Sequence, residues 1–351
     1  MGRFRHEPAP ITQRETAMSD QEFRNYLVQQ LAARRIDRRT FIGRMAAAGA
    51  AAGLITSLSG QALRAQTPVR GGHLVMGVPT ADPTDSLDPT KLNTTANLIA
   101  SFSVYDLLVN RDTDLRPIPM LATAWEPNAD ATEWVFDLRD GVTFHDGAAF
   151  SADDVIYSLQ RHLAEDSQSP TKAFLGQITA MEKLSALQIR FTLAAPNADF
   201  PITLSDTRLP ISQNGVDDFS GTVNGTGPFR VVEYAPASRV EFARFDGYWG
   251  TPANVDTFEM VGIADPTARV NALIAGDINC LMQLDPISVD LLDRSGAAQV
   301  IRATSGAQIN LAMMLDRAPT DNNDFRLAMK YAVDRQQIVD NVLKGYGSIG
   351  N

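Results

Sequence analysis

Apolar and polar residues alternate with a period of two in several short stretches of the chain. The clearest stretch is LQIRFTL, residues 187–193, in which every second residue is apolar. Such alternation is typical of a strand that buries one face. We predict strands wherever the pattern is alternating or continuously apolar over a short run: HLVMGVP at 73–79, LQIRFTL at 187–193, FRVVEYAP at 229–236, RVEFARF at 239–245 and VDTFEMVGI at 255–263.

The segment TEWVFDLRDGVTF, residues 132–144, contains the dipeptide Asp140-Gly141 between two apolar runs. Asp-Gly is a favoured pair in tight hairpin turns, because both residues tolerate a positive φ. We therefore predict a β-hairpin that turns at these two residues.

Other stretches repeat apolar residues every three to four positions, as one face of a helix does. One such stretch is TTANLIASFSVYDLLV, residues 94–109. The spacing predicts a helix there, and we expect its buried face to carry four residues: Leu98, Phe102, Tyr105 and Leu108.

The second half of the chain contains clearer helix ends. DPTARVNALIAGDIN begins with Asp265 before a proline and reaches Gly276. Asp is a favoured N-cap, proline fits the first turn and glycine often ends a helix, so a helix between these residues is predicted. Residues 323–345 predict two more helices, the second starting at Asp334 and stopping at Gly345. This mixture of strands and helices indicates an α/β fold.

The run GVTFHDGAAFSADDVIYSL, residues 141–159, gathers a histidine, three aspartates and two serines. Ser151 and Asp154 have the Ser-x-x-Asp spacing of a capping box, and acidic residues favour the positive end of a helix dipole. A catalytic pair would instead need carboxylates that face each other across a cleft. Adjacent Asp153 and Asp154 point to different faces of a helix. We interpret the run as a turn at residues 145–147 followed by the start of a helix.

The N-terminal region has the pattern of an export signal. Arg38 and Arg39 precede Phe41, and an Ala/Gly-rich run of 14 residues follows from Met45 to Leu58. A helix that spans a bilayer needs about 20 apolar residues. A basic region, a short apolar region and a small-residue exit compose a secretory leader. DRRTFIG resembles the twin-arginine signal, and a surface helix with two solvated arginines is the alternative interpretation.

We expect residues 1–65 to form this signal peptide, with cleavage near Ala62–Ala65 and a mature protein that begins near Gln66. Translation starts at Met1 or at Met18. The leader does not end in a cysteine, so attachment of a lipid at that position is excluded. These features predict a periplasmic protein whose partner during export is the twin-arginine translocase.

The charge of the chain is unevenly distributed. Residues 1–65 carry ten arginines and five acidic residues, a charge of +5, whereas the whole chain carries −10, so the remainder carries −15. A body this acidic is a poor partner for nucleic acid, because phosphate neutralisation needs a basic face. The length of 351 residues predicts two or more domains.

One cysteine and four histidines limit the chemistry open to the chain. Cys280 lies in the apolar stretch INCLMQL, and we interpret it as a small hydrophobe. The sequence has no nucleotide-binding glycine loop, no HExxH motif and no zinc ligand set. We therefore predict no cofactor, no metal and no enzymatic activity. An exported enzyme is the alternative, because the twin-arginine route often carries cofactor-loaded enzymes.

Four separated blocks of the sequence resemble family 5 extracytoplasmic solute-binding proteins, the peptide-, nickel- and glycoside-binding subunits of ABC importers. The most specific block is LATAWEPNADATEWVFDLRDGVTFHDGAAFSADDVIYSL. The other three are DSLDPTKLNTTANLIASFSVYDLLV, GTGPFRVVEYAPASRVEFARFDGYWG and DFRLAMKYAVDRQQIVDNVLKGYG. The blocks occur in the family's order, and the likeness covers essentially residues 72–351.

The resemblance implies a two-lobed α/β periplasmic binding protein of the class II type with an extra inserted domain. The implied domains are lobe I at 70–115 and 216–310, the inserted domain at 116–215, and the start of lobe II at 311–351. The family's lobe II continues well beyond two helices. We therefore expect this sequence to be a shortened form with an incomplete second lobe.

The resemblance also implies that a monomer captures a peptide or similar solute by hinge closure and delivers it to ABC permease and ATPase subunits. A sensor on the same fold that works without a transporter is the alternative. Peptide-binding members offer backbone just after the SLDP motif, which maps here to Asn93, Thr94 and Thr95. The alternative for these three residues is that they only cap the following helix. Asn310 is a further ligand-binding candidate, and the tryptophans are interpreted as packing residues.

Overall fold

The computed structural model describes residues 26–27, 30, 40–41, 44, 69–79, 85–221, 223–236, 238–302 and 309–350. The chain divides into two compact units, Met1–Arg70 and Gly71–Asn351. In the first unit, Leu27 and Phe41 are helical and buried. Arg38, Arg39 and the predicted cleavage region lie outside the described residues. None of the helices that the structure describes is long and apolar enough to cross a membrane.

A five-stranded sheet organises one part of the second unit, with the strand order β11-β1-β10-β9-β8. β1 runs parallel to both of its neighbours, whereas β10, β9 and β8 are joined antiparallel. The strands predicted from the sequence in this region are all present. The bounds are β1 (His73–Val78), β8 (Phe229–Ala235), β9 (Arg239–Arg244), β10 (Thr257–Gly262) and β11 (Cys280–Leu281).

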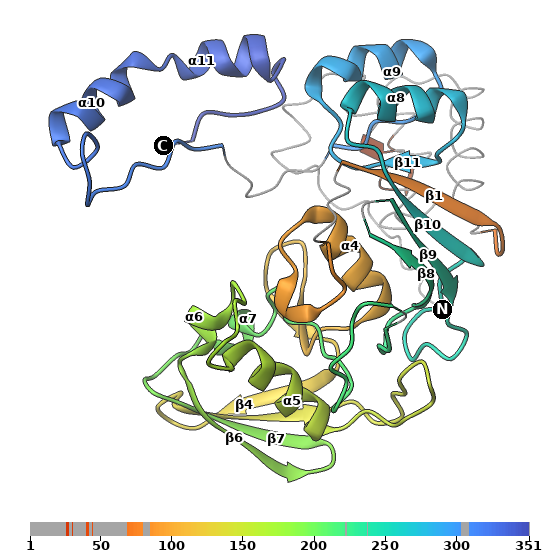
Figure 1. Cartoon of the computed structure of the whole chain (residues 1–351), viewed down its shortest axis with the longest axis vertical. Helices are drawn as coiled ribbons and strands as arrows, with labels where there is room; N and C mark the ends of the chain where they lie inside the picture. The colour runs from red at the N-terminus through yellow and green to blue at the C-terminus, as the bar shows by residue number, and fades with distance from the viewer. Residues whose placement is uncertain are drawn as a thin grey trace, which may run out of the picture. The chain divides into compact units, whose positions relative to one another are not determined.

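Helices flank this sheet (Figure 1). Helix α4 (Thr95–Val104) contributes to the same apolar core as β1, β9 and β10. Helix α8 (Pro266–Ala275) packs close to β11, and α9 (Val289–Ser295) follows it. The Asp265 carboxylate accepts the N–H of Ala268, and Gly276 ends the helix in the left-handed region. Both predicted ends of α8 are therefore confirmed.

The predicted buried face of α4 is right only in part. Tyr105 and Leu108 are buried as expected, but they lie beyond the end of the helix, and Phe102 is 45% exposed. The face that packs on the sheet carries Ala96 and Ala100 instead. Small side chains allow the helix backbone to approach the sheet closely. The face with the small residues is therefore the one that packs on the sheet.

A second, antiparallel sheet has the order β4-β5-β7-β6. Alternate residues of β7, from Ile189 to Leu193, are buried as predicted. Helix α5 (Ala152–Leu163) shares a core with this sheet, and Figure 1 shows it lying against the strands. The bounds are β4 (Ala122–Pro127), β5 (Glu133–Leu138), β6 (Ile178–Ser185) and β7 (Gln188–Leu193), with smaller elements β2 (Val109–Arg111), β3 (Pro117–Pro119), α6 (Lys172–Leu175) and α7 (Phe200–Thr203).

The predicted hairpin at Asp140-Gly141 is wrong as well. Gly141 has a positive φ, so the chain does turn there. However, β5 pairs with β4 and β7, and the residues after the turn make only one isolated bridge, between Thr143 and Ala149. Both edges of β5 are already occupied by other strands, which leaves the returning segment without an edge to join.

The run at 141–159 has the structural role that the sequence indicates. Gly147 adopts a positive φ in the turn. A capping box between Ser151 and Asp154 begins α5. The N–H and the hydroxyl of Ser151 donate to the same Asp154 oxygen, at 2.7 and 3.1 Å, and the second Asp154 oxygen accepts the N–H of Asn214 at 2.8 Å. Asp153 lies outside this network and pairs with Lys183.

The last described segment contains α10 (Asn323–Ala332) and α11 (Arg335–Gln337), which continues into the π-helical turn η4 (Ile338–Val342). The Asp334 side chain accepts the N–H of Gln337, as expected for the predicted N-cap. Several apolar side chains of this segment are exposed, among them Leu315, Tyr331 and Val342.

Candidate ligand-binding cleft

A cleft of about 390 Å³ lies where the loop ahead of α4 meets the segment that follows α7. Pockets that hold small molecules in proteins typically measure roughly 300–1,000 Å³. The residues that line the cleft are Leu92, Asn93, Leu98, Pro170, Asp206, Thr207 and Arg208. Leu98 belongs to the face of α4 that was expected in the core, and it forms part of the cleft wall instead.

The loop that carries Asn93 is fixed from its N-terminal side. Asp88 begins the short 3-10 helix η2 (Pro89–Lys91), where it accepts the N–H and the hydroxyl of Thr90, both at 2.9 Å. Arg161 of α5 donates to both oxygens of the same carboxylate. Burial alone would raise the pKa of Asp88, but the bonds from Arg161 and Thr90 outweigh it and the pKa is lowered. The loop therefore starts from a rigid point.

The three adjacent candidate residues have different roles. Asn93 is exposed and lines the cleft. The Thr94 hydroxyl accepts the N–H of Asn97 at 3.1 Å and donates to Asp85 at 3.1 Å, so Thr94 is the N-cap of α4. The Thr95 hydroxyl accepts a hydrogen bond from the Gln283 side chain at 3.0 Å. The capping alternative thus describes Thr94, and of the three residues only Asn93 contributes to the cleft lining.

Asn310 is exposed and lies in an irregular segment, and it is not among the described residues that line the cleft. The structure does not bring it together with Asn93.

Asp206 and Arg208 in the opposite wall were not identified from the sequence. Arg208 Nε and Nη2 donate to the two Asp206 oxygens at 2.8 and 2.7 Å. Burial would raise the pKa of Asp206, but the bonds from Arg208 outweigh it and lower the pKa, while the same bonds raise the pKa of Arg208. The two charges compensate each other. The only signal in the sequence was an acid and a base two positions apart, a pattern common on any surface.

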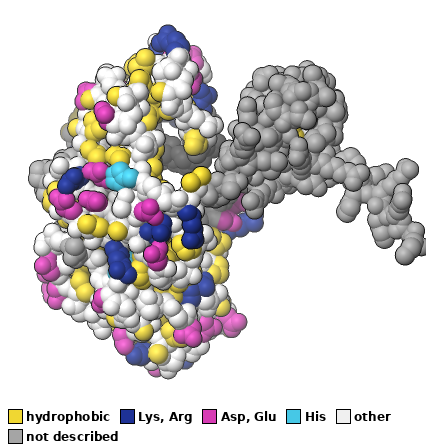
Figure 2. Space-filling view, turned by 90° about the vertical axis from the view of Figure 1, so that its right-hand side faces the viewer, with side chains coloured by type: hydrophobic (Ala, Val, Ile, Leu, Met, Phe, Trp, Pro, Cys, Tyr) yellow, Lys and Arg dark blue, Asp and Glu magenta, His cyan; other side chains and the backbone are white. Residues whose placement is uncertain are grey.

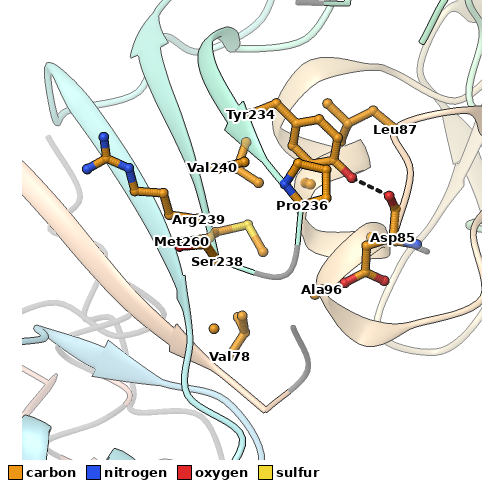
Figure 3. A pocket seen from close by; sticks show the side chains of 14 residues that line it. Val78, Asp85, Leu87, Ala96, Tyr234, Pro236, Ser238, Arg239, Val240 and Met260 are labelled. Atoms are coloured by element: carbon orange, nitrogen blue, oxygen red, sulfur yellow. Dashed lines mark hydrogen bonds between the residues drawn. The ribbon is translucent and has the colours of Figure 1, made fainter. Parts of the chain in front are cut away.

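A second hollow lies between α4 and the turn that joins β8 to β9 (Figure 3). Its free space is about 30 Å³, which is room for about two water molecules. The Tyr234 hydroxyl donates to the backbone oxygen of Asp85 at 2.6 Å across its rim. The Asn97 side chain lines it and is 4% exposed, and within the described part of the chain its amide nitrogen has no hydrogen-bond partner. This hollow is too small for a peptide, so the larger cleft is the candidate site.

The polar side chains of the turn at 145–147 form hydrogen bonds with backbone groups. His145 bonds the backbone of Gly225 and Gly227, and the Asp146 carboxylate accepts the N–H of Ala148 at 2.9 Å. Among the residues that the structure describes, no group of three or more His, Cys, Asp or Glu side chains could hold a metal ion. Acidic and basic side chains are intermixed on the face seen in Figure 2.

The tryptophans pack within the protein. Trp134 is buried and lies 6.3 Å from Phe136, and Trp125 stacks on the same ring at 5.9 Å, both measured between ring centroids. The indole nitrogen of Trp249 donates to the buried carboxylate of Asp106 at 2.7 Å. Cys280 is half-buried, and burial raises the pKa of its thiol. These residues have the packing roles that the sequence indicated.

Comparisons with known proteins identify the class. The family model described as "Bacterial extracellular solute-binding proteins, family 5 Middle" matches residues 116–351. The chain is 25% identical over 270 residues to the glutathione-binding protein GsiB of Pectobacterium atrosepticum, covering 75% of this chain and 52% of that protein. It is 27% identical over 259 residues to the dipeptide-binding protein of Escherichia coli, covering 66% of this chain and 48% of that protein.

A solved structure has the same fold. It is the periplasmic binding protein DppA of Helicobacter pylori in complex with the peptide STSA, which is 23% identical and superposes with a TM-score of 0.68. The match covers 80% of this chain and 60% of that one. The chain spans about half the length of the curated relatives it matches.

The structure match shows the α/β fold, and the family model gives the class, which is a family of solute-binding proteins. The chain belongs to the family 5 bacterial extracellular solute-binding proteins. The resemblance seen in the sequence is confirmed. This is a family that works outside the cytoplasm.

Proposed function

We propose that this protein is the substrate-binding component of an ABC importer, and that it captures a peptide or a solute of similar size and hands it to permease and ATPase subunits. The observation that carries the proposal is the cleft of about 390 Å³ with Asn93 in its wall. The relatives named for glutathione and dipeptides support a small peptide as the ligand. Binding requires no bond to be broken, so the proposed protein is not an enzyme.

The cleft favours a neutral, extended ligand portion. Leu98 and Pro170 offer apolar surface, while Asp206 and Arg208 already satisfy each other's charge. A ligand charge placed there would have to compete with a two-bond ion pair. In this proposal the backbone at Asn93 pairs with an extended ligand, which would supply affinity without reading side chains.

The two sheets support the proposed domain organisation. Strands drawn from both 73–78 and 229–281 build the five-stranded sheet, which suits a discontinuous lobe I at 70–115 and 216–310. The four-stranded sheet at 122–193 suits an inserted domain at 116–215. Residues 311–351 would begin lobe II. Asn93, Thr94, Thr95 and Asn310 remain the ligand contacts proposed from the sequence, and of these Asn93 lines the cleft.

Export through the twin-arginine translocase is proposed on the sequence DRRTFIG at residues 37–43. The leader would be removed near Ala62–Ala65, and the released protein would work in the periplasm as a monomer. Replacing Arg38 and Arg39 together by lysine should leave the protein in the cytoplasm. Periplasmic recovery of that variant at the wild-type level would contradict the proposed route.

Ligand binding is tested by melting-temperature shifts with glutathione, a panel of di- and tripeptides, and nickel with histidine. A ligand present at 100 times its Kd stabilises the folded state by about 2.7 kcal/mol, so a shift of several degrees is expected. Thr207→Trp would fill the cleft and should remove the shift. Ala180→Trp, on an exposed position of β6 outside the cleft lining, should keep it. No shift with any probe, or equal shifts in both variants, would contradict the proposed site.

A further inference from the structure

His162 forms a buried polar cluster close to the cleft. Its Nδ1 lies 2.6 Å from the Ser169 hydroxyl oxygen and 3.1 Å from that of Thr171. The two hydroxyls are 2.8 Å apart. The three side chains are almost completely covered, with residue exposures of 1%, 7% and 0%. A single imidazole nitrogen therefore joins the C-terminal turn of α5 to both of these residues.

The residue between the two hydroxyl-bearing residues is Pro170, which is exposed and lines the cleft. Proline has a fixed φ, so the position of its ring follows from where its two neighbours are held. The same short segment leads into α6, and the Lys172 side chain donates to the backbone oxygens of Ala164 and Glu165, both at 2.7 Å. His162 is thus the buried contact on one side of the segment, and Lys172 the exposed contact on the other.

An apolar core would be a simpler solution at this position. A buried polar cluster is costly unless every member is satisfied, and His162 Nε2 finds no hydrogen-bond partner among the described residues. Replacing such clusters by well-packed apolar residues is often neutral or stabilising. A leucine, however, would fill the space without directing the two hydroxyls. The hydrogen bonds of the cluster therefore fix the residues on either side of Pro170, even though the cluster adds little to the free energy of unfolding.

We propose that His162 is a positioning residue of the ligand site: through the Ser169 and Thr171 hydroxyls it holds Pro170 in the wall of the cleft. The inference rests on the proposed function for its effect on ligand affinity, but the positioning itself is a property of the protein without ligand. Residues of a binding site have to be held within about 0.5 Å of the productive geometry, so a residue that fixes the cleft wall should affect ligand affinity.

The charges around the imidazole are compatible with this role. Arg161 precedes it on α5, Asp88 binds that arginine from η2, and Asp206 contributes a negative charge from the opposite wall of the cleft. Burial is the largest influence on His162 and lowers its pKa to about 4. The imidazole is therefore neutral at ordinary pH, and its Nδ1 can form hydrogen bonds with the two hydroxyls.

The positioning is tested by hydrogen exchange on the full chain, measured by mass spectrometry of peptides that cover 167–176. His162→Asn places an amide group near the position of Nδ1 and should keep exchange within about twofold of wild type. His162→Leu removes the bonds and should raise exchange in this segment about tenfold or more. Exchange in the first turns of α5, residues 152–158, should not change. Equal protection of 167–176 in the leucine variant and wild type would overturn the proposal.

A second pair of variants covers the case in which His162→Leu does not fold. Ser169→Ala and Thr171→Ala each remove one hydroxyl and leave the imidazole in place. Each should raise exchange in 167–176, and Ser169→Ala also removes the acceptor of the Thr171 N–H at 3.3 Å. The double variant should raise exchange by less than the two effects multiplied, because the two hydroxyls bond the same nitrogen and each other. Fully independent effects, or no effect in any of the three, would overturn the proposal.

Ligand affinity provides the functional measurement, with glutathione and dialanine as probes in titration calorimetry. Kd should rise about tenfold in the Ser169→Ala, Thr171→Ala double variant and should stay close to the wild-type value in His162→Asn. Unchanged Kd in a double variant with raised exchange would overturn the link to the cleft while leaving the proposed function intact. If wild type binds neither probe, the peptide-binding function fails for these ligands, and the exchange data still decide whether His162 positions Pro170.

Discussion

Arg161 donates one hydrogen bond to each carboxylate oxygen of Asp88, at 3.0 and 3.1 Å, across 73 positions of the sequence. The guanidinium also lies over the ring of Phe219, 4.4 Å from its centroid. The pair connects α5, which shares a core with the four-stranded sheet, to the loop that leads to Asn93. One side-chain contact therefore ties the cleft loop to the part of the protein that forms the opposite wall.

Removing the Arg161 side chain should destabilise the protein by about 2–3 kcal/mol. The side chains are 18% and 10% exposed, so Asp88 would be left as a mostly buried, unpaired charge. The expected cost lies between the about 3–5 kcal/mol for breaking fully buried pairs and the near-zero value of surface pairs. Urea unfolding of Arg161→Ala, Asp88→Ala and the double variant measures the coupling energy. A coupling below about 0.5 kcal/mol would contradict the structural role given to the pair.

The two neighbouring aspartates at the start of α5 should behave differently. Asp154 is buried and accepts bonds from Ser151 and Asn214, whereas Asp153 is half exposed and pairs only with Lys183. Asp154→Asn should cost about 1–3 kcal/mol, because an amide nitrogen would face a backbone N–H donor. Asp153→Asn is the matched control and should change stability by less than about 0.5 kcal/mol. Equal effects in thermal unfolding would mean that the capping box is not what stabilises this helix.

The local features of the fold were predictable because short-range chemistry determines them. The strand β7 follows from its period of two, and both ends of α8 follow from Asp265 and Gly276. The capping box at Ser151 likewise depends on residues three positions apart. In each case the residues that fix the conformation are neighbours in the sequence, so the pattern contains the necessary information.

The errors concern contacts between distant segments. The exposed face of α4 could not be predicted, because the choice between Phe102 and Ala100 depends on how closely the sheet approaches. The hairpin predicted after β5 does not form, because β7, more than forty residues later, occupies the available edge of β5. The cleft residues Asp206 and Arg208 were missed for the same reason: they are brought opposite Asn93 only by the tertiary structure.

Gly225 should not tolerate a side chain. A Cβ at this position would lie 2.8 Å from the carbonyl carbon of Val104 and closer still to its oxygen, and these are backbone atoms at the end of α4 that cannot move aside. Gly225→Ala should therefore cost about 3 kcal/mol, in the upper part of the range for overpacking. Gly221→Ala is the control, because nothing lies within 4 Å of its Cβ position. Similar stability of the two variants in urea unfolding would contradict the close approach.

Acid should lower the free energy of unfolding through protonation of His145. Gly225 donates its N–H to Nδ1 at 3.3 Å, and Nε2 lies 3.0 Å from the Gly227 oxygen, so the site accepts only the neutral ring with its proton on Nε2. Burial is the largest influence and lowers the pKa from 6.5 to about 4. Between these two pH values the unfolded chain binds the proton more readily than the folded protein.

The free energy of unfolding should therefore fall as the pH drops from 6.5 towards 4, with His145 contributing at most about 1.4 kcal/mol per pH unit. Below pH 4 this contribution should stop growing, because the folded protein then takes up the proton too. His145→Phe keeps a ring beside Phe245 but cannot titrate, so it should be less stable at pH 7 and should show a shallower slope through the window. Comparing urea unfolding of the two proteins from pH 7 to 4.5 cancels the contribution of the carboxylates, which both share. If the free energy of unfolding falls with pH equally in both proteins, protonation of His145 does not contribute to acid instability. The hydrogen bonds with Gly225 and Gly227 would then not depend on a neutral imidazole.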